Sequence, residues 1–131
     1  MHFQCSLSDL LPVVNLVEKA VAAQDNIQVL KGIYISAADN QVTLTATNLE
    51  LGIRSEFPAH INQPGQAVVD GKLLAALVRT LPQEPVVFEL TDQQLMITAG
   101  AVEFSLTTMP PEDFPQLPEI DDLVFTLKSE Q

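Results

Sequence analysis

The apolar residues of this chain follow two spacings, which predict where its helices and strands lie. Two stretches show the spacing of a helix with one apolar face. In the first, predicted to end near Ala22, apolar residues stand at steps of four, three and four: Leu10, Val14, Val17 and Val21. In the second they are Leu73, Leu74, Leu77, Val78 and Leu81. Ser6 or Ser8 can cap the first helix, and Asp70 is predicted to cap the second, which Pro82 ends.

Alternating apolar and polar residues predict strands in most of the remaining chain. One strand precedes each helix, at residues 2–5 and 66–69, and three strands follow each helix. The six following strands are predicted at residues 33–35, 42–46, 49–57, 86–90, 95–97 and 102–106. The order β-α-β-β-β therefore occurs twice, at a period of roughly sixty-odd residues, which indicates duplication of a small unit. We expect an α+β fold in which two half-domains, each with one helix and one sheet, pack together to bury both apolar faces.

The last of these strands leads into an extended connector. Four prolines between residues 110 and 118 disfavour a helix there, and Phe114 and Leu117 can dock the connector onto a core. A further strand over residues 123–127 is predicted to open a following copy of the unit. The expected organisation is one domain over residues 1–120, with residues 121–131 forming a connector and the first strand of a truncated second domain.

Composition is compatible with a globular domain. The apolar share is 47%, and 131 residues fit one domain. No apolar run is long enough to span a membrane, and the start of the chain lacks the pattern of a secretory signal. The single cysteine, Cys5, has no second cysteine with which to form an internal disulfide. A reduced, cytoplasmic setting without a membrane partner is therefore expected.

The charge of the chain is strongly negative, and its few cations lie on the predicted helices. A net charge of −11 argues against a nucleic-acid partner unless the cations gather on one face. Lys19 lies on the polar face of the first helix, and Lys72 and Arg79 share one face of the second helix at a spacing of seven. Two adjacent helices would combine them into a sparse basic strip. On their own, three such cations are more typical of solvated helix ends.

The sequence gives little support for catalysis. His2 and His60 have no partner at a suitable spacing, and Cys5 sits among apolar neighbours as a small core residue would. The acidic pairs at 112–113 and 121–122 stand in the proline-rich connector and the tail, as a solvated acidic face would. No glycine-rich phosphate loop, CxxC pair or HExxH helix occurs. We therefore expect no catalytic residue, metal site or cofactor.

Three pieces of the chain together are specific for a known family. They are TATNLEL at 45–51, the helix 72–79 followed by Thr-Leu-Pro, and EFSL at 103–106 with DFPQL at 113–117. On these pieces the chain resembles, from residue 1 to about residue 120, the first domain of the bacterial sliding clamp, the beta subunit of the DNA polymerase III holoenzyme. The resemblance implies a DNA-clamp fold of two βαβββ half-domains and a non-catalytic processivity factor. In that family, three such domains form a subunit, and two subunits join head to tail around duplex DNA.

The resemblance also implies roles for particular residues. The expected DNA-facing residues are Lys19, Lys72, Arg79 and Gln24, although Gln24 stands where the family commonly has arginine. The expected subunit interface consists of Leu73 and Leu77 on the helix, and of Phe104 and Leu106 on the edge strand beside it. Without the resemblance, the residues themselves favour an ordinary core role for these four.

The implied partners are the phosphate backbone of double-stranded DNA and a second clamp subunit. The replicative polymerase and the clamp loader would bind through a third domain that this chain lacks. One alternative is a stand-alone acidic protein-binding module of the same fold that never encircles DNA. A second alternative is a small hydrolase that uses Glu112, Asp113 and His60, which would require these side chains to meet in one concave pocket. The sequence of this one domain predicts a monomer in solution.

Overall fold

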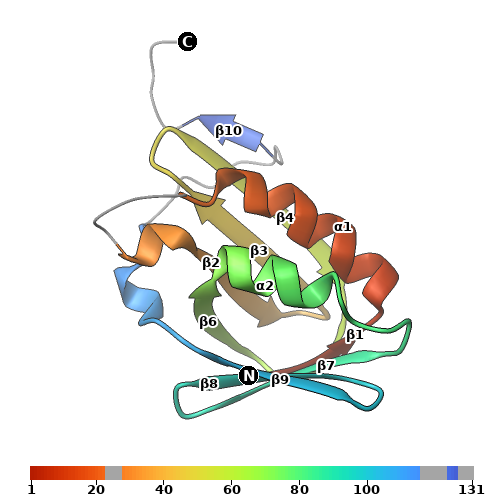
Figure 1. The fold of residues 1–131 in the computed structure, drawn as a ribbon. Helices are drawn as coiled ribbons and strands as arrows, with labels where there is room; N and C mark the ends of the chain where they lie inside the picture. The colour runs from red at the N-terminus through yellow and green to blue at the C-terminus, as the bar shows by residue number, and fades with distance from the viewer. Residues whose placement is uncertain (23–27, 116–123, 127–131) are drawn as a thin grey trace.

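Two five-stranded antiparallel sheets and two helices make up the part of the chain that the computed structural model describes, residues 1–22, 28–115 and 124–126 (Figure 1). One sheet has the order β5 (His60–Gln63), β1 (His2–Cys5), β7 (Val86–Thr91), β8 (Gln94–Ala99) and β9 (Val102–Thr107). The other has the order β10 (Val124–Thr126), β4 (Leu51–Pro58), β3 (Gln41–Thr47), β2 (Gly32–Ala38) and β6 (Gly65–Asp70). The helices are α1 (Leu7–Val17) and α2 (Gly71–Val78).

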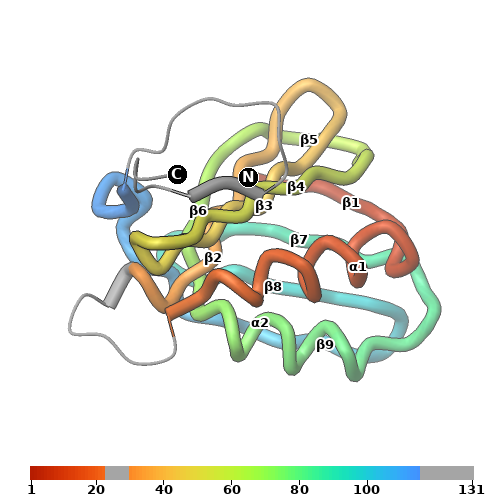
Figure 2. Tube along the Cα trace, turned by 90° about the horizontal axis from the view of Figure 1, so that it is seen from above, coloured from red at the N-terminus to blue at the C-terminus, as the bar shows by residue number. Residues whose placement is uncertain are grey.

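The two helices lie side by side and run in opposite directions (Figure 2). Helix α1 packs on β3 and β4, and α2 packs on β2 and β6. Their buried residues join those of both sheets in one hydrophobic core, whose largest fully buried side chains include Phe3, Phe88, Leu10 and Leu74. Neither helix, nor any other in the described part of the chain, is long and apolar enough to cross a membrane.

The two halves exchange their first strands. Strand β1, which opens the first half, pairs with β7 of the second half, and β6, which opens the second half, pairs with β2 of the first. The rings of Phe3 on β1 and Phe88 on β7 stack with centroids 4.7 Å apart and planes 12° apart. The expectation that each half contributes a sheet of its own is therefore wrong. Every sheet contains strands from both halves, which ties them into one unit.

Both predicted helix starts are confirmed, because each cap residue accepts a hydrogen bond from the first turn. Ser6 Oγ accepts from the Asp9 amide at 3.2 Å, and Asp70 Oδ1 accepts from the Leu73 amide at 2.9 Å. The first helix ends earlier than predicted: α1 stops at Val17 and continues as a 3₁₀ turn over Glu18–Ala20. Helical spacing in the sequence does not distinguish these two kinds of turn.

The TATNLEL motif forms a hydrogen-bonded turn between β3 and β4. The side-chain oxygen Oδ1 of Asn48 accepts hydrogen bonds from the backbone amides of Glu50 and Leu51 at 2.9 and 2.8 Å. The fully buried Thr47 hydroxyl accepts from the Leu49 amide at 3.0 Å and donates to the Leu51 carbonyl at 3.1 Å. Leu49 has a φ of +76° and is 45% exposed. It was predicted to lie in a strand, but the strand begins at Leu51.

The connector after β9 docks through Phe114, as predicted, but on a small cluster with Val68, Tyr34 and Met109 that is separate from the main core. The Met109 amide donates to the Val68 carbonyl at 2.8 Å, and the buried Phe114 ring lies 5.2 Å from that of Tyr34. Leu117 lies outside the described residues. Strand β10 pairs with β4, and its assignment to a second domain stays a prediction. The short strand β5 was not predicted, because most of its residues are polar and exposed.

We predict that Gly71→Ala destabilises the domain, although alanine favours helices more than glycine does. A Cβ at residue 71 would lie 2.6 Å from Val21 Cγ2 and 3.0 Å from Ile33 Cγ1, and the branched Val21 side chain has little freedom to move away. Overpacking should outweigh the gain of up to about 1 kcal/mol in helix propensity, and lower the free energy of unfolding by about 1–3 kcal/mol in urea denaturation.

The control is Ala76→Gly on the exposed face of the same helix, which should cost only the propensity difference of about 1 kcal/mol. Stabilisation by Gly71→Ala would contradict the assigned packing.

Candidate nucleic-acid interface

Helix α2 presents its cations on the side that faces away from the core. Leu74, Ala75 and Val78 are buried, whereas Lys72 and Arg79 are exposed. Their side chains are 55% and 47% exposed, respectively. The helical period places the two cations in one row, as the sequence predicts.

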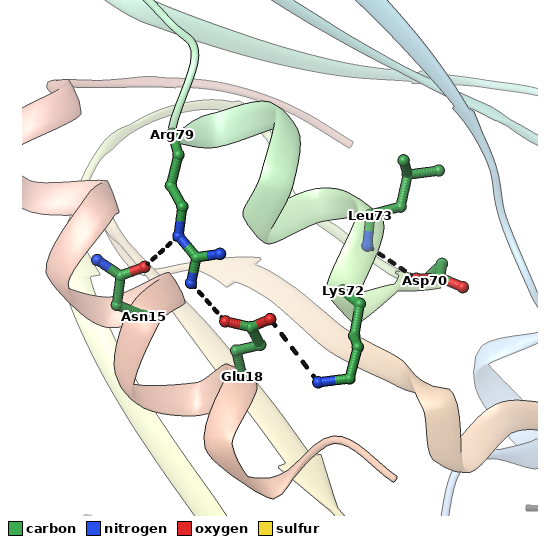
Figure 3. Close-up of polar contacts among 6 residues, drawn as sticks. All are labelled: Asn15, Glu18, Asp70, Lys72, Leu73 and Arg79. Carbon is green, nitrogen blue, oxygen red and sulfur yellow. Dashed lines mark hydrogen bonds and ion pairs between the residues drawn. The ribbon is translucent and has the colours of Figure 1, made fainter. Parts of the chain in front are cut away.

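The neighbouring stretch of α1 and its 3₁₀ turn adds Asn15 and Glu18 to this face (Figure 3). Arg79 Nε donates to Asn15 Oδ1 at 3.0 Å, and Arg79 Nη2 pairs with Glu18 Oε1 at 2.5 Å. Lys72 Nζ lies 3.9 Å from Glu18 Oε2. The Glu18 side chain is only 19% exposed, so it is held between the helices with one oxygen toward each cation. We call Lys72, Arg79, Glu18 and Asn15 the helix-face cluster.

The other two predicted DNA-facing residues do not belong to this cluster. Lys19 is exposed, one position beyond Glu18, and makes no ion pair within 4 Å with the described residues. Gln24 lies outside the described residues. The structure therefore brings Lys72 and Arg79 together around one carboxylate, while the place of Lys19 and Gln24 in a basic strip stays a prediction.

Sequence reasoning missed the role of Glu18. Helical spacing leaves Glu18 and Asn15 for the polar face of the first helix, but it does not show which residues of the second helix they meet. The contact between Asn15 and Arg79 joins positions 64 residues apart. Asn15 and Arg79 occupy equivalent positions in the two repeats, and this equivalence is the one signal that could have suggested their contact.

The four predicted interface residues differ in exposure. Leu73 is 48% exposed on α2, and Leu77 and Phe104 are partly buried against the core. Leu106 is 4% exposed and belongs to the core, so its side chain is not available to a partner in this structure. Strand β9, which carries Phe104 and Leu106, forms one edge of its sheet and lies next to α2 (Figures 1 and 2).

The residues of the alternative hydrolase do not come together. Glu112 lines a cavity of about 410 Å³ with Tyr34 and Arg54 under the connector, while His60 lines a separate cavity of about 400 Å³. Asp113 lines neither of them. In the described ranges, no three His, Cys, Asp or Glu side chains are grouped so as to hold a metal ion. The acid–base arrangement that this alternative requires is therefore not formed.

Cys5 is a core residue, as predicted, and its thiol is poorly suited to act as a nucleophile. Its side chain is buried, and burial, with a smaller contribution from the negative charge of Asp9, raises the pKa of the Cys5 thiol from 9.0 to about 12. Because the thiolate is the reactive form, almost none is available at neutral pH.

We predict that Cys5 makes folding depend on pH in the alkaline range. The pKa of Cys5 is higher in the folded chain, so its contribution to stability is complete below pH 9 and is lost as pH rises from about 9 to 12. The free energy of unfolding should fall across this range by at most about 1.4 kcal/mol per pH unit from this group, and Cys5→Ala should fall less steeply.

Urea denaturation of both proteins at a series of pH values measures the difference. Identical slopes, or rapid reaction of the native protein with a thiol reagent at pH 8, would contradict the buried, protonated thiol.

Comparison with known proteins places this geometry in a family. Residues 1–118 match the family described as DNA polymerase III beta subunit, N-terminal domain. A beta sliding clamp of Micrococcus luteus is 33% identical over 120 residues, which are 92% of this chain and 39% of that protein. The beta sliding clamp of Bacillus subtilis is 31% identical over 131 residues, covering 93% of this chain and 35% of that protein. This chain thus spans between a third and two fifths of the length of these relatives.

Solved structures agree with this match. The DNA polymerase sliding clamp from Bacillus subtilis superposes with a TM-score of 0.88 at 30% identity, over 93% of this chain and 34% of that one. The Caulobacter crescentus pol III beta structure has a TM-score of 0.87 at 30% identity, over 90% of this chain and 33% of that one. These matches confirm the expected DNA-clamp fold, and the chain belongs to the family of the DNA polymerase III beta subunit, as its N-terminal domain.

Proposed function

We propose that this chain is the first domain of a DNA sliding clamp, a non-catalytic processivity factor that encircles duplex DNA and slides on it without sequence specificity. The observation that carries the proposal is the row of exposed cations on the helix face of a domain that belongs to the clamp family. The helices would line the hole of the ring, with Lys19, Lys72, Arg79 and Gln24 toward the DNA.

Sliding requires contacts that hold phosphates weakly and read no bases. Contacts to phosphate oxygens carry no sequence information directly, and their strength depends on the number of cations. A few cations on a helix face meet this requirement, while the net charge of −11 disfavours adhesion of DNA to the remaining surface. Retention of DNA would then come from ring closure.

Ring closure would require a second subunit in a head-to-tail contact. The edge strand β9 and the neighbouring Leu73 support this surface, because an open sheet edge and a half-exposed leucine are features that a partner can cover. Residues 121–131 would lead into the next domain. Polymerase and clamp loader would bind elsewhere in the complete protein, in the bacterial cytoplasm at the nucleoid.

The first test is topological retention. The translation product of the complete reading frame, loaded by its clamp loader, should stay on nicked circular DNA through gel filtration and leave after the circle is cut. Release upon linearisation follows from encirclement, because a ring can slide off a free end. Equal retention on circular and linear DNA, or none on the circle, would contradict the proposal and favour the stand-alone binding module.

The second test addresses the interface. In the complete protein, Leu73→Ser should weaken dimerisation by about tenfold in sedimentation equilibrium, which corresponds to about 1.4 kcal/mol, the loss expected if Leu73 is one of the few side chains that dominate the interface energy. Because the side chain is 48% exposed in this domain, the folding of the domain should change little.

Leu49→Ser is the matched control: Leu49 is 45% exposed, but it lies in the turn before β4. An equal effect of both variants on dimerisation would contradict the interface at α2 and β9.

A further inference from the structure

Glu18 occupies an unexpected place for a face proposed to bind DNA. Its carboxylate lies within 4 Å of one lysine and one arginine nitrogen, so it pairs with two cations at once. Those cations, Lys72 and Arg79, are the two that α2 presents to solvent. The negative charge is therefore located where DNA phosphate would have to bind.

The hydrogen bonds of Arg79 show how direct this conflict is. The side-on edge of its guanidinium, formed by Nε and Nη2, is one of the edges that can bind two phosphate oxygens at once. Nε already donates to Asn15 and Nη2 to Glu18 (Figure 3). A phosphate that uses this edge must displace both acceptors, while a phosphate that uses the other edge meets a cation whose charge is partly neutralised.

The pairing is strong enough to compete and weak enough to be displaced. Both cations are about half exposed, and ion pairs in such positions contribute about 0–1 kcal/mol to stability. A phosphate, which carries a full negative charge, can therefore exchange with the carboxylate. The cost of that exchange is subtracted from the affinity for DNA.

We propose that Glu18 competes with DNA phosphate for Lys72 and Arg79, and that it thereby lowers the affinity of the helix face for duplex DNA. This inference rests on the proposed function. Its rival is that Glu18 only braces α1 against α2 and orients the two cations, in which case its removal would weaken DNA binding or leave it unchanged.

The experiment compares Glu18→Gln with Glu89→Gln in the 131-residue chain. Both variants remove one negative charge, but Glu89 is exposed on β7, where it alternates with the buried Phe88 and so faces away from the helices. A labelled duplex of about 20 base pairs is titrated with each protein, and its affinity is measured by fluorescence anisotropy at a series of salt concentrations between about 0.02 and 0.2 M. Lys72→Ala/Arg79→Ala is measured in parallel, and circular dichroism checks that every variant is folded.

Glu18→Gln should bind DNA on the order of tenfold more tightly near 0.05 M salt, with a slope of log K against log[salt] steeper by about 0.9, equivalent to one additional phosphate contact. Glu89→Gln should leave the slope unchanged. The inference would be overturned if Glu18→Gln and Glu89→Gln bound DNA with the same affinity and salt slope, or if Glu18→Gln bound DNA more weakly than the parent. In that case, loss of DNA binding in the double alanine variant would still support the DNA-facing strip. If the double alanine variant binds like the parent, or if no protein binds, the DNA-facing strip and the inference both fail.

Discussion

The exchange of first strands between the two halves is the constraint on which the rest of this structure depends. Strand β1 completes the sheet of the second half and β6 that of the first, so neither half can satisfy its backbone hydrogen bonds or bury its apolar face without the other. The stacked pair Phe3 and Phe88 lies within this exchange. Each helix directly follows an exchanged strand, and its position relative to the two sheets is therefore set by pairing with the opposite half.

The position of the helices determines which side chains are free for function. Because α1 and α2 direct their apolar faces into the common core, the remaining face of each helix meets solvent, and polar side chains along the boundary between the two helices contact each other. Asn15 and Glu18 on one side thus reach Lys72 and Arg79 on the other. The helix-face cluster is a product of tertiary packing, although each of its members stands on the face that helical spacing predicts.

Features with a local cause could be predicted from the sequence, whereas features that arise from tertiary packing could not. Helix starts were predictable because a cap is decided within a few residues, as at Ser6 and Asp70, and the strands with clear alternation were found. The strand exchange was not predictable, because β1 and β6 would bury the same residues whether they joined the sheet of their own half or that of the other half. Strand β5 carries mostly exposed polar side chains and gives no periodic signal. Glu18 was placed on the right face, but its partners belong to another part of the chain.

The strongly negative charge is compatible with the proposed DNA-facing role if DNA is retained by closure of a ring and not by the affinity of the protein surface for DNA. A protein that holds DNA by affinity needs many cations, and each neutralised phosphate makes sliding and release more sensitive to salt. A closed ring retains DNA by its topology, so its inner face needs only enough positive charge to keep the duplex from being repelled. If the chain acts in such a ring, the Glu18 carboxylate between Lys72 and Arg79 would reduce an attraction that closure makes unnecessary. The same carboxylate would be a defect in a protein that depended on affinity alone.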